Sequence, residues 1–589
     1  MNDDATTKEG WRLLRATLKQ QKRGLTAGIA VGLLWTIGKI AVPQLTRFAI
    51  DRGIERGGSL LSWTLLILAA AVIAGFFSGF RRFFAFRESR LTETILREKL
   101  FAHLQGLHVG FHDRTQTGQL MSRASSDLQQ IQGFVVMIPI TISNVGMIIG
   151  AVIILIATDP TLAIFALAPL PFVNIAFRRF SDRIHETVLK VQQEQAQLAN
   201  VVEETVSGVR VIKGFGAELV QARKLEKEAD DIQAVSLQAS RIRSRFLPAI
   251  DLLPTLGLIA VLGVGGHRVM NGDMSVGELV AFNAYLTLLV WPLRNIGMTV
   301  AMGQRAASAL LRVHEILSEE SIITDPKSPV VLPKSALAQP VGAVSFKDVS
   351  FSYEVGHTDV RVLGGLTLDI APGESLAIVG ATGSGKSTIT RLLLRFYDPQ
   401  SGLITLDGVD LRALRLRDLR SSIGVVFEDT LLFHDTVSAN IAFAKPDVDF
   451  SVVRNAAKLA SAHEFIRQLP DGYDTLIGER GYSLSGGQRQ RIAIARAIVA
   501  DPRVLVLDDA TSAVDPTKEH EIRDALATVM RGRTTLVIAH RPATIELADR
   551  VALLDDGKIV ATGTHVEMLA TNERYQEVLA SWTVAKEES

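Results

Sequence analysis

The sequence predicts a membrane domain built from six α-helices, followed by a separate α/β domain. The chain has 589 residues, which is too long for a single hydrophobic core to organise. Hydrophobic residues make up 47% of the chain, and its mean hydropathy is +0.23. Long apolar stretches occur throughout the first half, whereas short β-rich runs alternate with helical segments in the second half. A helical membrane domain and a partly parallel sheet follow from these patterns.

Composition excludes several classes of protein and site. The formal net charge is +1, so the chain lacks the basic excess of a nucleic-acid-binding protein. Cysteine is absent, which excludes disulfides, a thiol nucleophile and Cys-ligated metals. The polar, acidic segment Met1–Glu9 has no cleavable signal pattern, so we expect the first membrane helix to direct insertion.

Six apolar stretches approach the length of about 20 residues that crosses a bilayer as a helix. They are Leu25–Ile50, Leu60–Phe80, Phe134–Ala157, Leu162–Phe177, Leu247–Gly266 and Leu279–Val300. Lys and Arg crowd the linkers 81–123 and 178–245, whereas the opposite loops carry only Arg52, Arg56 and Arg268. The positive-inside bias therefore places these two linkers and both termini in the cytoplasm. Because the linkers are helix-forming, we expect the membrane helices to continue beyond the bilayer.

Two further segments set the expected domain boundaries. The stretch Trp11–Arg23 is basic and amphipathic, which predicts an elbow helix along the inner membrane surface. After Leu317, prolines from Pro326 to Pro340 indicate a linker. We expect a membrane domain over residues 1–317, a linker over 318–340 and an α/β domain over 341–589.

A phosphate-binding loop follows the predicted strand Ser375–Val379. The loop reads Gly380-Ala381-Thr382-Gly383-Ser384-Gly385-Lys386-Ser387-Thr388 and opens a helix through Leu394. In such a loop the backbone N–H groups and the helix N-terminus bind phosphates, Lys386 reaches the outer phosphates and the Ser387 hydroxyl ligates Mg²⁺. A chance Gly-rich turn is the alternative, and the flanking strand and helix disfavour it.

Two more motifs point to the same chemistry. The apolar strand Val504–Leu507 ends in Asp508 and Asp509, a position that brings a carboxylate to Mg²⁺ opposite a phosphate loop. Upstream lies Leu484-Ser485-Gly486-Gly487-Gln488, followed by a helical segment from Ile492 to Val499. The Ser485 hydroxyl and the glycine N–H groups at a helix start form an anion site without a lysine of its own.

The Leu-Ser-Gly-Gly-Gln run resembles the signature of ATP-binding-cassette (ABC) proteins, and the resemblance extends over nearly the whole chain. It implies a six-helix membrane domain of the exporter type, followed by an ABC ATPase domain that uses ATP and Mg²⁺. It also implies that Ser485, Gly486, Gly487 and Gln488 bind the γ-phosphate held by another subunit. Tyr353 matches the aromatic residue that stacks on adenine, and His540 matches the switch histidine at the γ-phosphate. Core packing of Tyr353 and capping by His540 are the alternatives.

Other segments resemble contact regions of exporters. Glu479–Gly481 is similar to the segment that touches the membrane domain, and Ser512–Asp515 is similar to the loop that contacts the second ATPase domain. Thr117–Arg123 and Glu204–Lys213 resemble the cytoplasmic coupling loops. The resemblance implies a dimeric transporter in the bacterial inner membrane, with both termini and the ATPase domain in the cytoplasm.

Two positions depart from the family pattern. Asp509 stands where the family usually has a catalytic Glu, and the shorter side chain displaces the carboxylate by about 1.5 Å. A shift of about 1 Å can cost on the order of a hundredfold in rate. Glu428 replaces a Gln that contacts Mg²⁺; a carboxylate still ligates the metal but alters its charge environment. We therefore favour a heterodimer with a weak site on this subunit, and a homodimer with Asp509 as base is the alternative.

Polar residues inside the apolar stretches bear on the transported molecule. Lys39, Asn174 and Asp251 lie in the first, fourth and fifth stretches, and intramembrane polar groups often face a translocation path. Snorkelling or an internal ion pair is the alternative. The substrate is expected to be a small amphiphile, and the sequence does not select among a drug-like amphiphile, a lipid, a peptide and a siderophore. Import by an exporter-shaped protein, a membrane-tethered regulatory ATPase and a gated channel remain rival functions.

Overall fold

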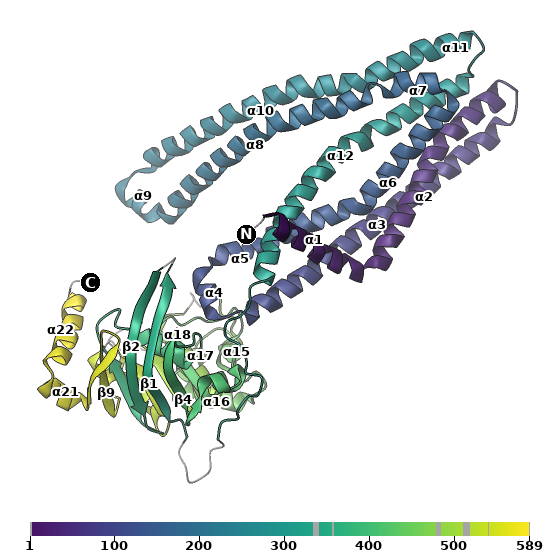
Figure 1. Cartoon of the computed structure of the whole chain (residues 1–589). Coiled ribbons are helices and arrows are strands. Elements are labelled where there is room, and N and C mark those ends of the chain that lie inside the picture. Colours follow the sequence, from purple (N-terminus) through teal and green to yellow (C-terminus); the bar gives the residue numbers. More distant parts are fainter. Residues whose placement is uncertain are drawn as a thin grey trace. The chain divides into compact units, whose positions relative to one another are not determined.

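The computed structural model describes residues 3–333, 341–355, 358–478, 484–509, 519–539 and 541–587, which form two compact units (Figure 1). The first unit comprises Met1–Gln105 and Gln116–Glu319. The second comprises Gly106–Thr115 and Glu320–Ser589. The short segment Gly106–Thr115 therefore belongs to the second unit, although residues of the first unit flank it on both sides in the chain.

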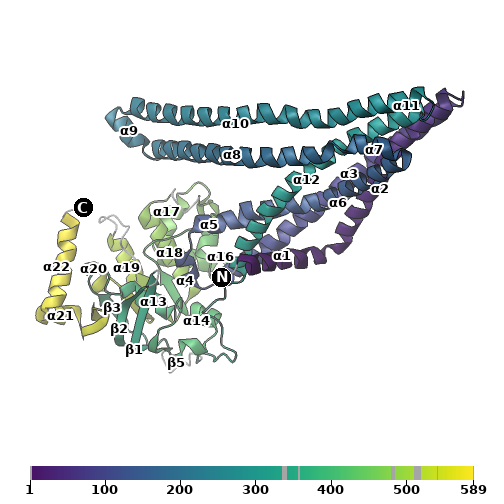
Figure 2. The ribbon, with the colours of Figure 1, turned by 45° about the horizontal axis from the view of Figure 1, so that its top comes forward.

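The described residues of the first unit fold into helices. Its α-helices are α1 Asp3–Gln20, α2 Lys22–Phe48, α3 Leu60–Gly106, α5 Thr117–Ser122, α6 Leu128–Thr158, α7 Pro160–Leu167, α8 Leu170–Ser207, α9 Val209–Phe215, α10 Glu218–Ala260, α11 Gly266–Met270 and α12 Val276–Leu317. Short π-helical turns occupy η1 Ala49–Ile54, η2 Arg123–Asp127 and η3 Val261–Gly265. Helices α8 and α10 lie side by side and are joined by α9 (Figure 2).

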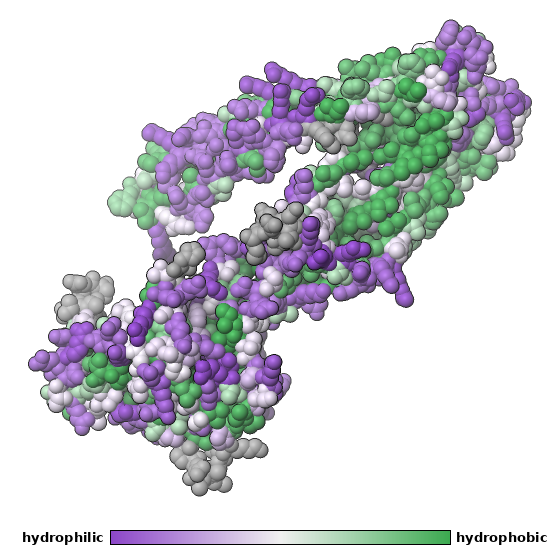
Figure 3. Space-filling model, viewed as in Figure 1, coloured by the Kyte–Doolittle hydropathy of each residue, from purple (hydrophilic) through white to green (hydrophobic). Residues whose placement is uncertain are grey.

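Within the described residues, six helical stretches are long and apolar enough to cross a membrane. They run over Lys22–Ile54, Leu60–Gly106, Thr117–Thr158, Pro160–Ser207, Glu218–Met270 and Val276–Leu317. Each contains one predicted apolar stretch and extends beyond it, as expected. Hydrophobic side chains gather on the surface of these stretches, whereas hydrophilic ones cover much of the α8 and α10 pair near α9 (Figure 3). Exposed apolar helix surfaces of this extent need a lipid or protein neighbour.

The elbow helix α1 packs its apolar face against other helices. Leu14 is 2% exposed and joins a buried cluster with Leu310 and Val313 of α12. The Trp11 ring meets Phe134 edge-on, with the ring centroids 5.5 Å apart. Protein rather than lipid therefore covers this part of the amphipathic face.

Helices α2 and α3 cross at close range because small residues line their contact. A Cβ at Gly38 would lie 3.1 Å from the Cβ of Ala74, and a Cβ at Gly32 would lie 3.2 Å from Cδ of Arg81. The two helices run antiparallel, so residues 38 and 32 of α2 face Ala74 and Arg81, which lie about two turns apart on α3. This contact positions the Arg81 side chain between the helices, where it is 4% exposed.

The second unit is an α/β structure with two sheets. Its strands are β1 Val344–Val355, β2 Thr358–Ile370, β3 Ser375–Val379, β4 Ser401–Leu406, β5 Val409–Asp410, β6 Ile423–Val426, β7 Val504–Asp508, β8 Thr534–Ile538, β9 Arg550–Asp555 and β10 Lys558–Gly563. One sheet has the strand order β2-β1-β4-β5 and is antiparallel. The other has the order β10-β9-β3-β8-β7-β6, with parallel pairing everywhere except at β10. The mixed sheet agrees with the partly parallel sheet that the sequence predicts.

Helices of the second unit pack around these sheets. They are α4 Val109–Arg114, α13 Lys386–Leu393, α14 Leu416–Ser422, α15 Val437–Ile441, α16 Phe450–Leu459, α17 His463–Arg467, α18 Gly486–Ala500, α19 Glu519–Met530, α20 Pro542–Ile545, α21 His565–Thr571 and α22 Glu573–Glu587. Short 3₁₀ turns are η4 Leu411–Ala413 and η5 Gly472–Asp474. The five residues of β3 are all buried, since a central parallel strand is covered on both faces. This buried strand fixes the position of the loop that follows it.

Candidate functional site

The loop after β3 and the carboxylates after β7 meet at one edge of the mixed sheet. Strand β8 lies between β3 and β7 and is parallel to both. The backbone N–H of Asp509 donates to the carbonyl of Ile538 at 3.0 Å, which ties the end of β7 to the end of β8. Ligands of open α/β sheets bind outside the carboxyl ends of the strands.

The loop backbone takes conformations that suit glycine. Gly383 and Gly385 have φ values of 83° and 105°, in the left-handed half of conformational space that glycine enters without strain. A Cβ at Gly383 would meet no atom within 4 Å, whereas one at Gly380 would lie 2.3 Å from the carbonyl oxygen of Leu554. The loop is therefore held closely against β9 on one side and open at Gly383.

Lys386 begins α13 and turns back onto the loop. Its Nζ donates to the carbonyl oxygens of Gly380 at 2.8 Å and Ala381 at 2.9 Å. The residue is 5% exposed, and burial lowers the pKa of its ammonium group, while Asp508 and Asp509 oppose this shift. The ammonium group is thus poised over the loop beside the two carboxylates.

Asp508 and Asp509 form the acidic side of the site. Burial first, then repulsion from Glu428 and Asp509, raises the pKa of Asp508 to about 6. Burial also raises the pKa of Asp509, while Arg541 and Lys386 lower it. Asp509 is 8% exposed, and its Oδ1 has no hydrogen-bond partner among the described residues. Buried carboxylates with perturbed pKa values and a free oxygen are typical of sites that serve a ligand or a reaction.

The backbone of Asp509 is strained as well. Its φ is 45°, a conformation that non-glycine residues adopt rarely and at a cost of order 1 kcal/mol or more. The fold retains this conformation at the end of β7, where it sets the direction of the carboxylate.

Tyr353 lies in an aromatic cluster beside α13. Its ring packs edge-on against Phe351 and Tyr397, with centroid distances of 4.8 Å and 5.3 Å. Its hydroxyl lies 3.3 Å from the Thr388 hydroxyl, and the Arg391 guanidinium lies 5.9 Å from the ring centroid. The structure thus connects the predicted adenine-stacking residue to the helix that begins at Lys386.

The segment Gly106–Thr115 adds residues that sequence reasoning missed. Tyr397 donates from its hydroxyl to a carboxylate oxygen of Asp113 at 2.6 Å, and Arg391 lies 3.4 Å from the same oxygen. Burial and then the Asp113 carboxylate raise the pKa of Tyr397. A cavity of about 220 Å³ is lined by residues of this segment, such as His108, together with Tyr353 and Tyr397. No motif spacing in the sequence pairs Asp113 with a position nearly 300 residues later.

The signature segment begins helix α18. The Ser485 hydroxyl accepts from the N–H of Gln488 at 3.3 Å, and the Gln488 side chain accepts from the N–H of Ser485 at 2.9 Å. This reciprocal capping box leaves Gly486 and Gly487 at the first turn of a 15-residue helix. Ser485 is exposed, so this end of α18 is open to an external ligand.

Several predicted positions lie outside the described residues. They are His540, Glu479–Gly481 and Ser512–Asp515. Among the other metal candidates, Ser387 lies in the first turn of α13 and Glu428 is exposed just after β6. Glu428 acts electrostatically on Asp508, so the two carboxylates belong to one site.

The residues present fit ATP and Mg²⁺. The loop is open at Gly383, where its backbone faces free space, and a buried ammonium group stands beside it. Ser384 Oγ is buried without a partner among the described residues, as is Asp509 Oδ1. Donors on one side and carboxylates on the other match a nucleotide phosphate and its divalent cation.

Lys39 and Asp251 line two cavities that share Thr287 and Trp291 of α12. Lys39 lines a cavity of about 400 Å³ together with Arg81 and Arg82. Asp251 lines another cavity, of about 370 Å³, with Trp291. The helix that contains Asn174 is described, but the side chain of Asn174 is not.

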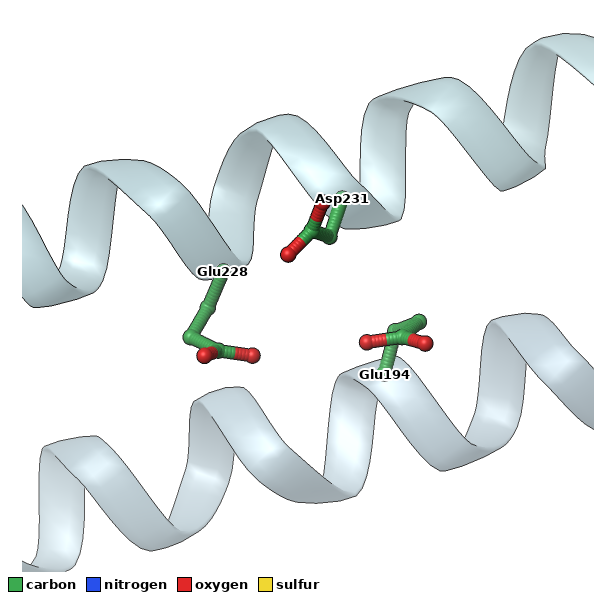
Figure 4. A group of neighbouring side chains, drawn as sticks. All are labelled: Glu194, Glu228 and Asp231. Carbon is green, nitrogen blue, oxygen red and sulfur yellow. The ribbon is translucent and has the colours of Figure 1, made fainter.

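A trio of carboxylates faces the gap between α8 and α10. Glu194 on α8 lies opposite Glu228 and Asp231 on α10, with carboxylate oxygens within 4.8 Å of one another (Figure 4). Asp231 is exposed and the other two are half-buried. Like charges at this range repel each other, so the trio opposes close packing of the two helices at this level.

Comparisons with known proteins identify the family. The family model for the ABC transporter transmembrane region matches residues 25–293, and the family model described as ABC transporter matches residues 363–512. The chain is 36% identical to an uncharacterized ABC transporter ATP-binding protein, YknU, of Bacillus subtilis, covering 93% of each protein. It is 34% identical to the ATP-dependent lipid A-core flippase of Chromohalobacter salexigens, over 97% of this chain and 98% of that protein.

Two further relatives define the type. The multidrug efflux ATP-binding/permease protein of Mycobacterium bovis is 35% identical over 97% of this chain, which spans 47% of that longer protein. The structure of a bacterial Atm1-family ABC exporter with ATP bound superposes with a TM-score of 0.76 at 28% identity, covering 95% of this chain and 98% of the other. The chain belongs to the ABC transporters, as an exporter half-transporter whose ATPase domain couples ATP hydrolysis to transport.

Proposed function

We propose that this subunit exports or flips a small amphiphile and works as a heterodimer, in which its own ATP site is slow and its signature segment completes a faster site on the partner. The observation that carries the proposal is Asp509, a buried, strained aspartate at the position of the attacking-water base. Its carboxylate ends about 1.5 Å short of where a glutamate would reach.

The site geometry and the family resemblance together support a role for each residue. The loop 380–388 binds the phosphates, Lys386 neutralises the outer ones, and Tyr353 stacks on the adenine. Ser387, Asp508 and Glu428 hold Mg²⁺, which when bound neutralises charge that develops on the transferred phosphoryl group. Asp509 orients the attacking water, and the family resemblance assigns His540, which lies outside the described residues, to the γ-phosphate.

The signature residues act on the partner's nucleotide. Ser485, Gly486, Gly487 and Gln488 form an exposed helix start with a complete capping box, so the anion-binding turn is in place before a nucleotide arrives. A backbone site of this kind has little affinity alone, and it gains affinity when a second subunit presents a nucleotide already held by its own loop. Dimer formation therefore belongs to the catalytic cycle.

A homodimer is the second candidate, and one observation favours it. The free Oδ1 of Asp509 and the raised pKa of this carboxylate are properties of a general base. In that case Asp509 is sufficient as the base that activates water, and both ATP sites of the dimer hydrolyse ATP at the same rate.

Membrane placement and substrate class complete the proposal. The basic linkers support a cytoplasmic location for the ATPase unit and both termini, and the proposed membrane is the bacterial inner membrane. Relatives named for multidrug efflux and for lipid A-core flipping support an amphiphile that partitions into lipid.

ATP hydrolysis by the purified full-length chain in lipid tests the proposal. We expect low turnover for the wild type alone, at least about tenfold higher turnover for Asp509→Glu, and no turnover for Lys386→Ala. Asp556→Glu, the same chemical change at an exposed positive-φ aspartate, is the matched control and leaves turnover unchanged. Robust wild-type turnover that Asp509→Glu does not raise would establish the homodimer and reject the slow site.

A further inference from the structure

The cavity that contains Lys39 has a consistent chemical character. It is lined by residues of α2, α3, α6 and α12, all within the first unit. Among the described residues, its charged lining residues are Lys39, Arg81 and Arg82, and none of its lining residues is a carboxylate. Two tryptophans, Trp35 and Trp291, supply aromatic walls. The cavity is therefore cationic and partly apolar.

Arg81 is the buried cation among the residues that line this cavity. It is 4% exposed, and its guanidinium lies over the Trp35 ring at 3.7 Å from the centroid. Its Nε and Nη1 have no hydrogen-bond partner among the described residues, and neither does the buried Nε1 of Trp35. Three buried donor atoms thus lack an acceptor. A buried cation without a partner is costly, so an acceptor-bearing anion would relieve a cost that the free protein carries.

The cations are spread along the axis of the helices. Arg81 packs opposite Gly32, and Ala74 packs opposite Gly38, the neighbour of Lys39. Seven residues of α2 separate positions 32 and 39, which corresponds to about 10 Å along the helix axis. Arg81 directly follows the apolar stretch Leu60–Phe80, whereas Lys39 lies inside its own apolar stretch. The cavity therefore reaches from the end of the apolar zone into it.

We propose that this cavity binds the head group of an anionic amphiphile, a phosphate or carboxylate on an apolar chain, as the transported molecule. The head group accepts hydrogen bonds from Arg81 and Trp35 and pairs with Lys39, while the chain lies against Trp291 and the exposed apolar surface of the spans. The inference rests on the proposed transport function and names its substrate class.

Binding is measured on the nucleotide-free, full-length protein in nanodiscs of zwitterionic lipid. The probe is 12-bromododecyl phosphate, whose bromine quenches tryptophan fluorescence. We expect quenching by this probe, at least about tenfold weaker binding of it to Arg81→Gln, and weaker binding to Lys39→Met. Arg81→Lys retains binding because the charge is kept. Arg52→Gln, an exposed cation in η1, is the matched control and changes affinity by less than about twofold.

Two comparison probes identify the ligand chemistry. A bromododecyl trimethylammonium salt has the same chain and the opposite charge, and equal affinity for it would overturn the anion preference. Equal competition by inorganic phosphate would overturn the amphiphile in favour of a free-anion site. If Arg81→Gln is poorly folded, probe binding to Lys39→Met is the deciding measurement, because Lys39 is exposed in the protomer and its replacement does not disturb packing. Unchanged affinity of Lys39→Met for the bromododecyl phosphate would refute the site.

The same samples separate this inference from the transport function. ATP hydrolysis that is abolished by Lys386→Ala supports the ATPase, whatever the probe does. Charge-dependent probe binding without ATP-dependent transport of the probe would support the site and refute its role as the transport site for this substrate class. Failure of both would refute both.

Discussion

Replacing Glu428 by Gln is expected to make Mg²⁺ binding less sensitive to acid. The pKa of Asp508 is raised to about 6 by burial and by repulsion from Glu428 and Asp509. At pH 7.5 such a group is about 97% ionised, and at pH 6 about 50%. Because a proton and Mg²⁺ compete for the same carboxylate, Mg²⁺ affinity falls as pH falls, by about twofold between these two values in the wild type.

The substitution removes one cause of the raised pKa and leaves the other two. In Glu428→Gln the pKa of Asp508 therefore lies between its ordinary value of 3.8 and about 6, so the loss of affinity at pH 6 is smaller than twofold. Glu428 is exposed, so the change does not disturb packing.

The assay is the Mg²⁺ dependence of fluorescent ATP-analogue binding at several pH values between 5.5 and 7.5. Protonation of the nucleotide affects every variant equally, so the ratio of wild type to variant isolates the protein carboxylates. Asp429→Asn removes the neighbouring exposed carboxylate, which does not act on Asp508, and serves as the control. Identical acid midpoints for wild type and Glu428→Gln would refute the electrostatic coupling.

Three further perturbations follow from the packing. Gly380→Ala places a Cβ 2.3 Å from the carbonyl oxygen of Leu554, and we expect it to reduce ATP-analogue affinity by more than about tenfold because the loop must move. Tyr397→Phe removes the hydrogen bond to Asp113, and the expected loss of interaction free energy is about 1 kcal/mol because the carboxylate is partly exposed. We expect this variant to show weaker substrate stimulation of ATP hydrolysis, while its ATP-analogue affinity stays within about twofold of the wild type. Leu310→Ala, at a fully buried position, costs about 2–5 kcal/mol and lowers the thermal transition of the membrane unit.

Each of these has a contradicting outcome. Gly478→Ala, where an added Cβ meets no atom within 4 Å and the backbone φ is not positive, is the control for Gly380, and equal affinities in the two variants would contradict the steric argument. An Asp113→Asn, Tyr397→Phe double variant whose effects simply add would show that the two side chains are not coupled. A Leu310→Ala transition within about 1 °C of wild type would contradict its burial in the cluster with Leu14.

The sequence predicted those parts of the fold in which local pattern and burial agree. Strand β3 and the phosphate loop could be placed because an apolar run, glycines and a helix start follow one another within twenty residues. The six spans could be placed because each needs a long apolar surface. Their full lengths could not, since the halves of α8 and α10 next to α9 are polar and their ends depend on turns such as Gly208.

The contacts of the site itself were harder to predict. The contact between Asp113 and Tyr397 joins positions far apart in the chain, and neither residue stands in a motif. The effect of Glu428 on Asp508 depends on the distance between the ends of two strands, which only the sheet order sets. Arg81 was assigned by charge to a cytoplasmic linker; its burial against Trp35 depends on the small residues of the α2 and α3 contact.

Helix α3 has a mechanical consequence for the chain. It runs for 47 residues from Leu60 to Gly106, a continuous rod of about 70 Å. Within the residues described for it there is no proline to act as a joint. A tilt of about one degree at one end displaces the other by about 1 Å. A tilt of about two degrees around Arg81, which lies about 38 Å along the axis from Gly106, therefore displaces Gly106 by about 1 Å. This is as large as the offsets that separate active from inactive catalytic geometry, and it needs no rearrangement inside the helix.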